Sequence, residues 1–86
     1  MSDIEEAKSK ELQEREERQN ELIHHVTESI LCFMEERGLS KAEMARRLNQ
    51  SRSNVTQMTA GNRNLTLRNL ADLCWAAGAK ISITLE

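Results

Sequence analysis

Residues 52–58, RSNVTQM, hold side chains whose types and spacing suit hydrogen bonding to nucleic-acid bases. Arg52, Ser53, Thr56 and Gln57 stand at positions i, i+1, i+4 and i+5, so on a helix they share one outer face. Arginine pairs well with guanine, and glutamine with adenine, in the major groove of DNA. The face holds no large apolar side chain and is therefore poorly suited to hydrophobic docking. We expect it to contact base edges.

The cysteine and histidine side chains do not indicate a catalytic or metal-binding site. Cys32 and Cys74 lie far apart in apolar helical patterns without a C-x-x-C motif, which predicts two reduced, buried thiols; a disulfide or metal site is the alternative. His24 and His25 are adjacent, so on a helix they would point about 100° apart and could not easily share a metal. The sequence contains no nucleophile–base pair and no phosphate-binding glycine loop. We expect no enzymatic activity, no cofactor and no metal.

The first packed helix is predicted by an apolar stripe that begins after Glu21 and ends before Gly38. Its spacing is that of a helix with one buried face. Glycine is the usual residue just past such a helix. The stripe consists of Leu22, Ile23, Val26, Ile30, Phe33 and Met34.

Capping signals divide the following region into three shorter helices. The second begins after Ser40, with Glu43 completing a capping box, and runs to about Leu48. Asn49 follows, and asparagine tolerates the left-handed conformation of a tight turn. The third helix would run from Ser51 to about Ala60 and the fourth from Thr66 to Gly78, with Gly61 closing the third. The buried stripe expected in the fourth helix is Leu67, Leu70, Leu73, Cys74 and Ala77.

Charge is divided unevenly along the chain, whose formal net charge is −2. Residues 1–37 carry five basic and eleven acidic residues, a net of −6, whereas residues 38–86 carry seven basic and three acidic residues, a net of +4. This split predicts an acidic tail beside a basic functional half. Residues 1–20 lack a sustained apolar heptad, so we expect a frayed, solvated helix or a disordered tail. No apolar run is long enough to span a membrane, and the acidic start does not resemble a signal peptide.

The segment 80–86, KISITLE, alternates polar and apolar residues, as a strand does. A strand needs a partner for its backbone groups, and the sequence offers no second one. We therefore expect two copies to pair these strands across a two-fold axis, which would bury Ile81, Ile83 and Leu85. Trp75 would extend the same interface; the alternative is a half-exposed side chain that packs on its own domain.

The expected fold class is all-α, with four to five small helices and one short C-terminal strand. The expected divisions are an acidic tail or helical extension at 1–20, a helical domain at 21–78 and a dimerisation strand at 79–86.

Residues 38–78 resemble the helix-turn-helix domain of the Cro/phage-repressor family, also called XRE-like. The similarity is carried by three segments: SKAEMARRL at 40–48, SRSNVTQM at 51–58 and GNRNLTL at 61–67. Asn49 departs from the usual glycine, and Thr59-Ala60 departs from the polar residues usual before Gly61.

The resemblance implies roles for individual residues. The third helix would enter the major groove, with Arg52, Ser53, Thr56 and Gln57 facing the bases. Residues at the helix starts and in the loop after the third helix would contact phosphates. These are Ser40, Lys41, Ser51, Asn54, Asn62, Arg63 and Asn64.

The function expected from these features is that of a homodimeric, sequence-specific repressor that binds an inverted repeat in double-stranded DNA and occludes a promoter. Its setting would be the bacterial or phage nucleoid in the cytoplasm, without a membrane partner. The strand after the fourth helix also resembles the C-termini of HipB- and HigA-type antitoxins. The alternative function is therefore an antitoxin that binds a protein toxin through its acidic tail and represses its own operon.

Overall fold

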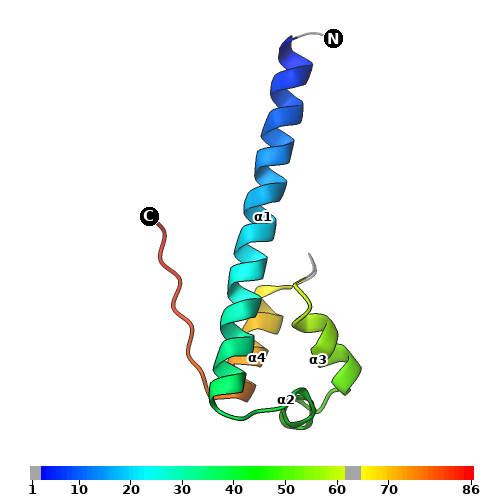
Figure 1. Ribbon diagram of the computed structural model, residues 1–86, viewed down its shortest axis with the longest axis vertical. Coiled ribbons are helices and arrows are strands. Elements are labelled where there is room, and N and C mark those ends of the chain that lie inside the picture. Colours follow the sequence, from blue (N-terminus) through cyan, green and yellow to red (C-terminus); the bar gives the residue numbers. More distant parts are fainter. Residues whose placement is uncertain (1–2, 62–64) are drawn as a thin grey trace.

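The computed structural model describes residues 3–61 and 65–86, with side chains from residue 6 onward. These residues form four helices: α1 (Asp3–Glu36), α2 (Lys41–Leu48), α3 (Arg52–Met58) and α4 (Leu67–Ala77). The short helices α2, α3 and α4 cluster around one end of α1, which projects far beyond them (Figure 1). The expected all-α fold is confirmed.

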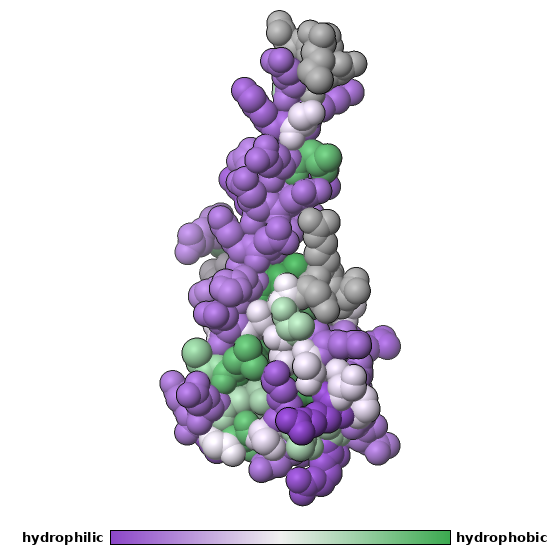
Figure 2. Space-filling model, turned by 45° about the vertical axis from the view of Figure 1, so that its right-hand side comes forward, coloured by the Kyte–Doolittle hydropathy of each residue, from purple (hydrophilic) through white to green (hydrophobic). Residues whose placement is uncertain are grey.

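Helix α1 is one continuous helix that includes the charged segment, for which the sequence left a helical extension and a tail open. No glycine or proline interrupts its charged half, which consists almost entirely of good helix formers. Glu14 and Arg18 also form an i, i+4 ion pair at 3.4 Å. Figure 2 shows that the projecting part of α1 is hydrophilic over almost all of its visible surface. Only the C-terminal half of α1 contributes to the core.

The core lies where all four helices meet. Met44 of α2, Val55 of α3 and Leu73 of α4 are fully buried at its centre. Each buried side chain of this size contributes roughly 1.5–3 kcal/mol of transfer free energy. The remaining buried apolar residues are Ile30, Met34, Ala45, Met58, Leu70, Cys74, Ala76 and Ala77.

The predicted starts of α2, α3 and α4 are confirmed. The hydroxyls of Ser40, Ser51 and Thr66 accept hydrogen bonds, each 3.1 Å long, from the backbone N–H three residues later. Helix α3 ends at Met58, slightly before the predicted end at Ala60, and Thr59 is its C-cap. The buried Thr59 hydroxyl donates to the Val55 carbonyl.

Three residues expected in buried positions are exposed, and those predictions are wrong. Leu22 lies on α1 before the helix reaches the core, and 65% of its surface is exposed. Leu67 is the first residue of α4 and is 75% exposed. Cys32 lies on an outer face of α1 and is also exposed.

Residues 79–86 leave α4 and run beside α1 as a chain without regular structure (Figure 1). The strand predicted for residues 80–86 does not form in the single chain, so this prediction needs correction. The physical reason is that a strand is held by hydrogen bonds to a neighbouring strand, and residues 3–61 and 65–86 of one copy supply none.

Candidate nucleic-acid interface

A tight turn at Asn49 sets the crossing of α2 and α3. Asn49 has φ 53° and ψ 46°, and it is the only non-glycine residue with positive φ among those described. Its N–H donates to the Arg46 carbonyl at 3.2 Å, and the Gln50 N–H donates to the Ala45 carbonyl at 2.9 Å. This pair of bonds is a Schellman motif, which satisfies the last carbonyls of α2 while the chain reverses.

Helix α3 has a buried side and an exposed side. Val55 and Met58 point into the core, with 0% and 7% of their surfaces exposed. The structure brings the four predicted base-contacting residues together on the opposite, exposed side of the same helix. These are Arg52, Ser53, Thr56 and Gln57. The buried pair therefore holds the helix firmly while its polar side chains stay accessible.

The residues predicted to contact phosphates lie in three places. Ser40 and Lys41 are at the start of α2, and Ser51 and Asn54 are at the start of α3. The loop residues Asn62, Arg63 and Asn64 lie outside the described part of the chain. The hydroxyl oxygens of Ser40 and Ser51 accept the capping hydrogen bonds. A hydroxyl can also donate, so each proton can still bind a phosphate oxygen.

A polar contact in the turn was not anticipated from the sequence. The Asn54 side-chain amide donates to the Gln50 side-chain oxygen, linking the turn to the first turn of α3. The spacing of four residues between a glutamine and an asparagine is the signal that could have revealed it. Gln50 therefore joins the candidate interface as a residue that orients Asn54.

The Arg47 side chain binds to another helix of the domain rather than contributing to the candidate interface. Its Nη1 donates to the Ala76 carbonyl at 2.6 Å, at the C-terminal end of α4. Cations are favoured at that end of a helix because of its partial negative charge. Arg46, its neighbour in the sequence, is exposed and remains available for general attraction to an anion.

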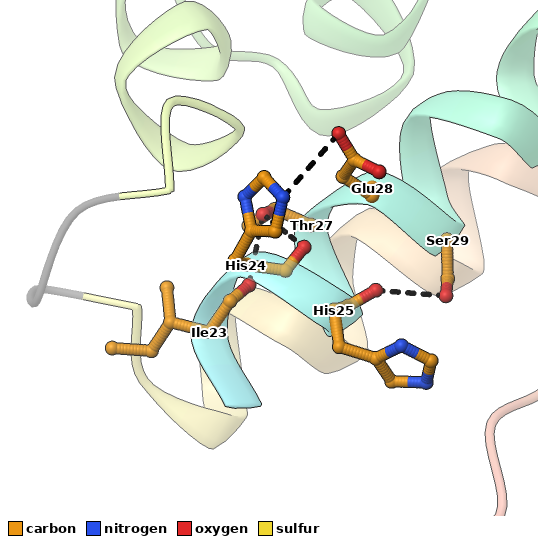
Figure 3. Close-up of polar contacts among 6 residues, drawn as sticks. All are labelled: Ile23, His24, His25, Thr27, Glu28 and Ser29. Atoms are coloured by element: carbon orange, nitrogen blue, oxygen red, sulfur yellow. Dashed lines mark hydrogen bonds and ion pairs between the residues drawn. The ribbon is translucent and has the colours of Figure 1, made fainter. Parts of the chain in front are cut away.

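The histidines and cysteines form no centre in the part of the chain that is described. Figure 3 shows His24 directed toward Glu28, with Nε2 and Oε1 3.5 Å apart, and His25 pointing to another side of α1. No group of three possible metal ligands occurs among the described residues. Both cysteines are free thiols, and burial raises the pKa of Cys74.

A helix, a left-handed turn and a second helix with an exposed polar face define a helix-turn-helix domain, here supported by α1 and α4. A family model for the Cro/C1-type HTH DNA-binding domain matches residues 30–82, more than half of the chain. The protein therefore belongs to the Cro/C1-type helix-turn-helix family, whose members are DNA-binding regulators rather than enzymes. No curated protein and no solved structure matches the chain. In residues 3–61 and 65–86, no helix is long and apolar enough to cross a membrane.

Proposed function

We propose that this protein is a homodimeric repressor that binds an inverted repeat in double-stranded DNA and blocks a promoter. The observation that carries the proposal is the exposed polar face of α3, held on a fully buried Val55 in a Cro/C1-type domain. Such a helix presents hydrogen-bonding groups at the depth of the major groove. The protein would act on DNA in the cytoplasm of a bacterium or a phage-infected cell.

The proposed division of labour follows the position of each residue. Side chains on the exposed face of α3 contact base edges and determine the sequence that is bound: Arg52, Ser53, Thr56 and Gln57. Residues at the starts of α2 and α3 and in the following loop contact phosphates and fix the orientation of α3. These are Ser40, Lys41, Ser51, Asn54, Asn62, Arg63 and Asn64.

Dimerisation is proposed to occur through the C-terminal segment, residues 79–86, together with Trp75. The apolar side chains of Ile81, Ile83 and Leu85 are exposed in the single chain, and so is Trp75. Their burial against a second copy would remove apolar surface from water. A dimer would hold two α3 helices about 34 Å apart, the spacing of one turn of DNA.

The test is selection of bound sequences from a random DNA pool, followed by titration of the best site at two salt concentrations. We expect an enriched inverted repeat and a steep loss of affinity with salt. Arg52→Ala and Gln57→Ala should each weaken binding by about tenfold to a hundredfold and relax the choice of one base pair. Arg15→Ala removes the same charge from the projecting half of α1 and should leave the choice of base unchanged.

Two results would contradict the proposal. The first is failure to enrich any site, with weak and sequence-independent binding. The second is normal initiation by RNA polymerase on a promoter whose site is fully bound, which would exclude occlusion as the mechanism.

A second function, that of an antitoxin, is favoured by the projecting half of α1. The described side chains of this acidic segment, residues 6–20, are exposed apart from the half-buried Glu16, and the helix extends away from the core. It therefore offers a surface for a basic protein. The test is co-purification with the product of an adjacent gene: a toxin partner should be lost when residues 1–14 are deleted, while DNA binding persists.

A further inference from the structure

The projecting half of α1 carries two acidic and two basic side chains on one face. They stand at positions i, i+3, i+4 and i+7, which lie together on the surface of a helix. All four are exposed, and together they line one open hollow on α1. This surface is called the charged seam below. It consists of Glu11, Glu14, Arg15 and Arg18.

Within one copy, the charges of the charged seam are only partly paired. Arg18 Nη2 and Glu14 Oε1 lie 3.4 Å apart, but the two side chains keep 79% and 64% of their surfaces exposed. Glu11 and Arg15 form no ion pair with a residue in the described part of the chain. Exposed ion pairs contribute little to stability, so these charges can be paired anew by a partner without a large loss.

The order of the charges makes the charged seam complementary to itself. From the N-terminus the order is acid, acid, base, base, and in the opposite direction it is base, base, acid, acid. Two copies that meet in opposite directions, about a two-fold axis between residues 14 and 15, therefore set every acid against a base. Glu11 faces the partner's Arg18, and Glu14 faces the partner's Arg15. A parallel arrangement in register would set like charges against each other.

An exposed apolar side chain continues the same face toward the core. Leu22 follows Arg18 by four residues, and it remains largely exposed in the single chain. In the antiparallel arrangement, Leu22 faces the partner's Ala7, whose small side chain leaves room for a larger one. A contact between leucine and alanine would therefore lie at each end of the paired seams and would remove apolar surface from water.

We propose that the projecting halves of α1 from two copies associate antiparallel, with the charged seam of one copy against that of the other. The contact uses neither residues 79–86 nor Trp75, so it is separate from the proposed homodimer and does not depend on it. Helix α3 packs beside the opposite half of α1 and keeps its exposed face (Figure 1). One helix-turn-helix domain would lie at each end of the paired helices.

The contact is expected to be weak. Exposed ion pairs are individually weak and are screened by salt, and each copy covers only one large apolar side chain. A weak contact becomes effective when two copies are already held near each other, for example on neighbouring DNA sites, because their local concentration is then high. In solution we expect it at high protein concentration and low salt.

Rearranging the charges at constant net charge tests the proposal. The double variant Glu11→Arg, Arg15→Glu keeps the composition, but across the axis it sets arginine against arginine and glutamate against glutamate. A quadruple variant reverses every charge and restores all the opposite pairs: Glu11→Arg, Glu14→Arg, Arg15→Glu and Arg18→Glu. Sedimentation equilibrium of the full-length proteins measures their association at about 0.05 M and about 0.5 M salt.

The wild-type chain and the quadruple variant should associate alike at low salt and less at high salt. The double variant should show a dissociation constant for this contact that is roughly tenfold higher or more, because its opposed charges repel. Both variants keep opposite charges four residues apart, so their helix content by circular dichroism should not fall. Equal association of all three proteins, or association of none, would overturn the proposal.

The design separates this contact from the proposed homodimer. Dimerisation through residues 79–86 would raise the mass of all three proteins by the same factor. Association through the charged seam would raise the mass of the wild-type chain and the quadruple variant further. Failure of the homodimer would leave monomers, and the seam would then still convert two of the three proteins to dimers.

Disulfide trapping tests the antiparallel register. Ala7→Cys and Leu22→Cys are made separately in full-length chains that carry Cys32→Ser, while the buried Cys74 is kept. In the proposed arrangement position 7 faces position 22 of the partner, whereas like positions lie about 22 Å apart along the axis, too far for a disulfide. Oxidation of an equal mixture should give an abundant disulfide between the two variants, and either variant alone should give little.

A matched control uses the other exposed leucine of the projecting half. Leu12 is exposed but lies on a neighbouring side of α1, about 100° from Glu11. A mixture of Leu12→Cys with Leu22→Cys should therefore crosslink far less than the mixture of Ala7→Cys with Leu22→Cys. Equal yields from the two mixtures, or efficient crosslinking of Leu22→Cys alone, would overturn the antiparallel register.

Discussion

Val55 and Thr56 are neighbours in α3, yet the fold gives them opposite surroundings. Val55 is completely buried, whereas Thr56 lies on the exposed face. A change at Val55 therefore acts on the core, and a change at Thr56 acts on whatever the exposed face contacts. The two positions separate effects on stability from effects on binding.

Val55→Ala should lower the free energy of unfolding by about 2 kcal/mol, through lost transfer free energy and the cavity left behind. Thr56→Ala should change it by less than about 0.5 kcal/mol, as exposed substitutions usually do. Urea unfolding followed by circular dichroism measures both. Equal losses of stability would contradict the division of α3 into buried and exposed sides.

The two thiols should react very differently. Cys32 is exposed, whereas burial raises the pKa of Cys74 above its ordinary value of 9.0. A thiol reagent at neutral pH should modify Cys32 rapidly and Cys74 only after unfolding, because the thiolate is the reactive species. Mass spectrometry of the modified native protein measures this. In a Cys32→Ser variant, rapid native-state labelling would contradict the burial of Cys74.

The raised pKa of Cys74 makes the free energy of unfolding depend on pH in the alkaline range. Above pH 9 the unfolded chain loses the Cys74 proton more readily than the folded chain does. Stability contributed by the protonated thiol is therefore complete below that pH and declines above it.

At the scale of the elements, α2 is held against α3 by the turn at Asn49 and against α4 by one tertiary hydrogen bond. The left-handed conformation of Asn49 allows both Schellman hydrogen bonds to form. The bond from Arg47 to the Ala76 carbonyl then fixes the end of α2 against the end of α4. Together they hold the scaffold on which α3 is displayed.

Asn49→Ala should destabilise the protein by about 1 kcal/mol, because a β-carbon without a compensating polar group is strained in the left-handed region. Asn49→Gly should be neutral or slightly stabilising, since glycine adopts that conformation freely. Thermal unfolding of the two variants gives the comparison. A glycine variant as unstable as the alanine variant would show that the asparagine side chain itself is required.

At the scale of the whole molecule, acidic and basic residues lie at opposite ends of an elongated chain, whose extents are 54 × 29 × 19 Å. The projecting half of α1 is acidic, and exposed or half-buried basic residues such as Lys41, Arg46 and Arg52 lie on the helix-turn-helix end. Acidic residues repel DNA at distances comparable to the Debye length, about 10 Å at 0.1 M salt. The long helix is therefore expected to weaken DNA binding at low salt.

Deleting residues 1–14 removes five acidic and two basic residues, a net charge of −3. DNA binding should strengthen by roughly threefold at low salt, and the difference should shrink as salt is raised. The urea midpoint should change little, because the described side chains of this segment, residues 6–14, are all exposed. Titration of the selected DNA site at several salt concentrations tests the charge effect, and a loss of affinity at every salt concentration would instead show that α1 assists binding.

Local features of the sequence determined the starts of the three short helices and the side chains that share the exposed face of α3. The capping serines and threonine bond to groups three residues away, and the left-handed turn is a property of one residue, so both can be inferred from short segments. The helical spacing of Val55 and Met58 likewise placed Arg52, Ser53, Thr56 and Gln57 on one exposed face. The family and the all-α class followed from these same segments.

Features that depend on distant parts of the chain were decided by the tertiary structure. Periodicity marked Leu22, Cys32 and Leu67 as apolar, but only the extent of the core determines whether a partner element covers them. The Arg47 bond spans 29 residues and leaves no local signal. For residues 80–86, the sequence by itself determined the alternation of apolar and polar side chains. The tertiary structure decided that residues 3–61 and 65–86 of one copy offer no second strand, because backbone pairing requires a neighbour that lies elsewhere in space.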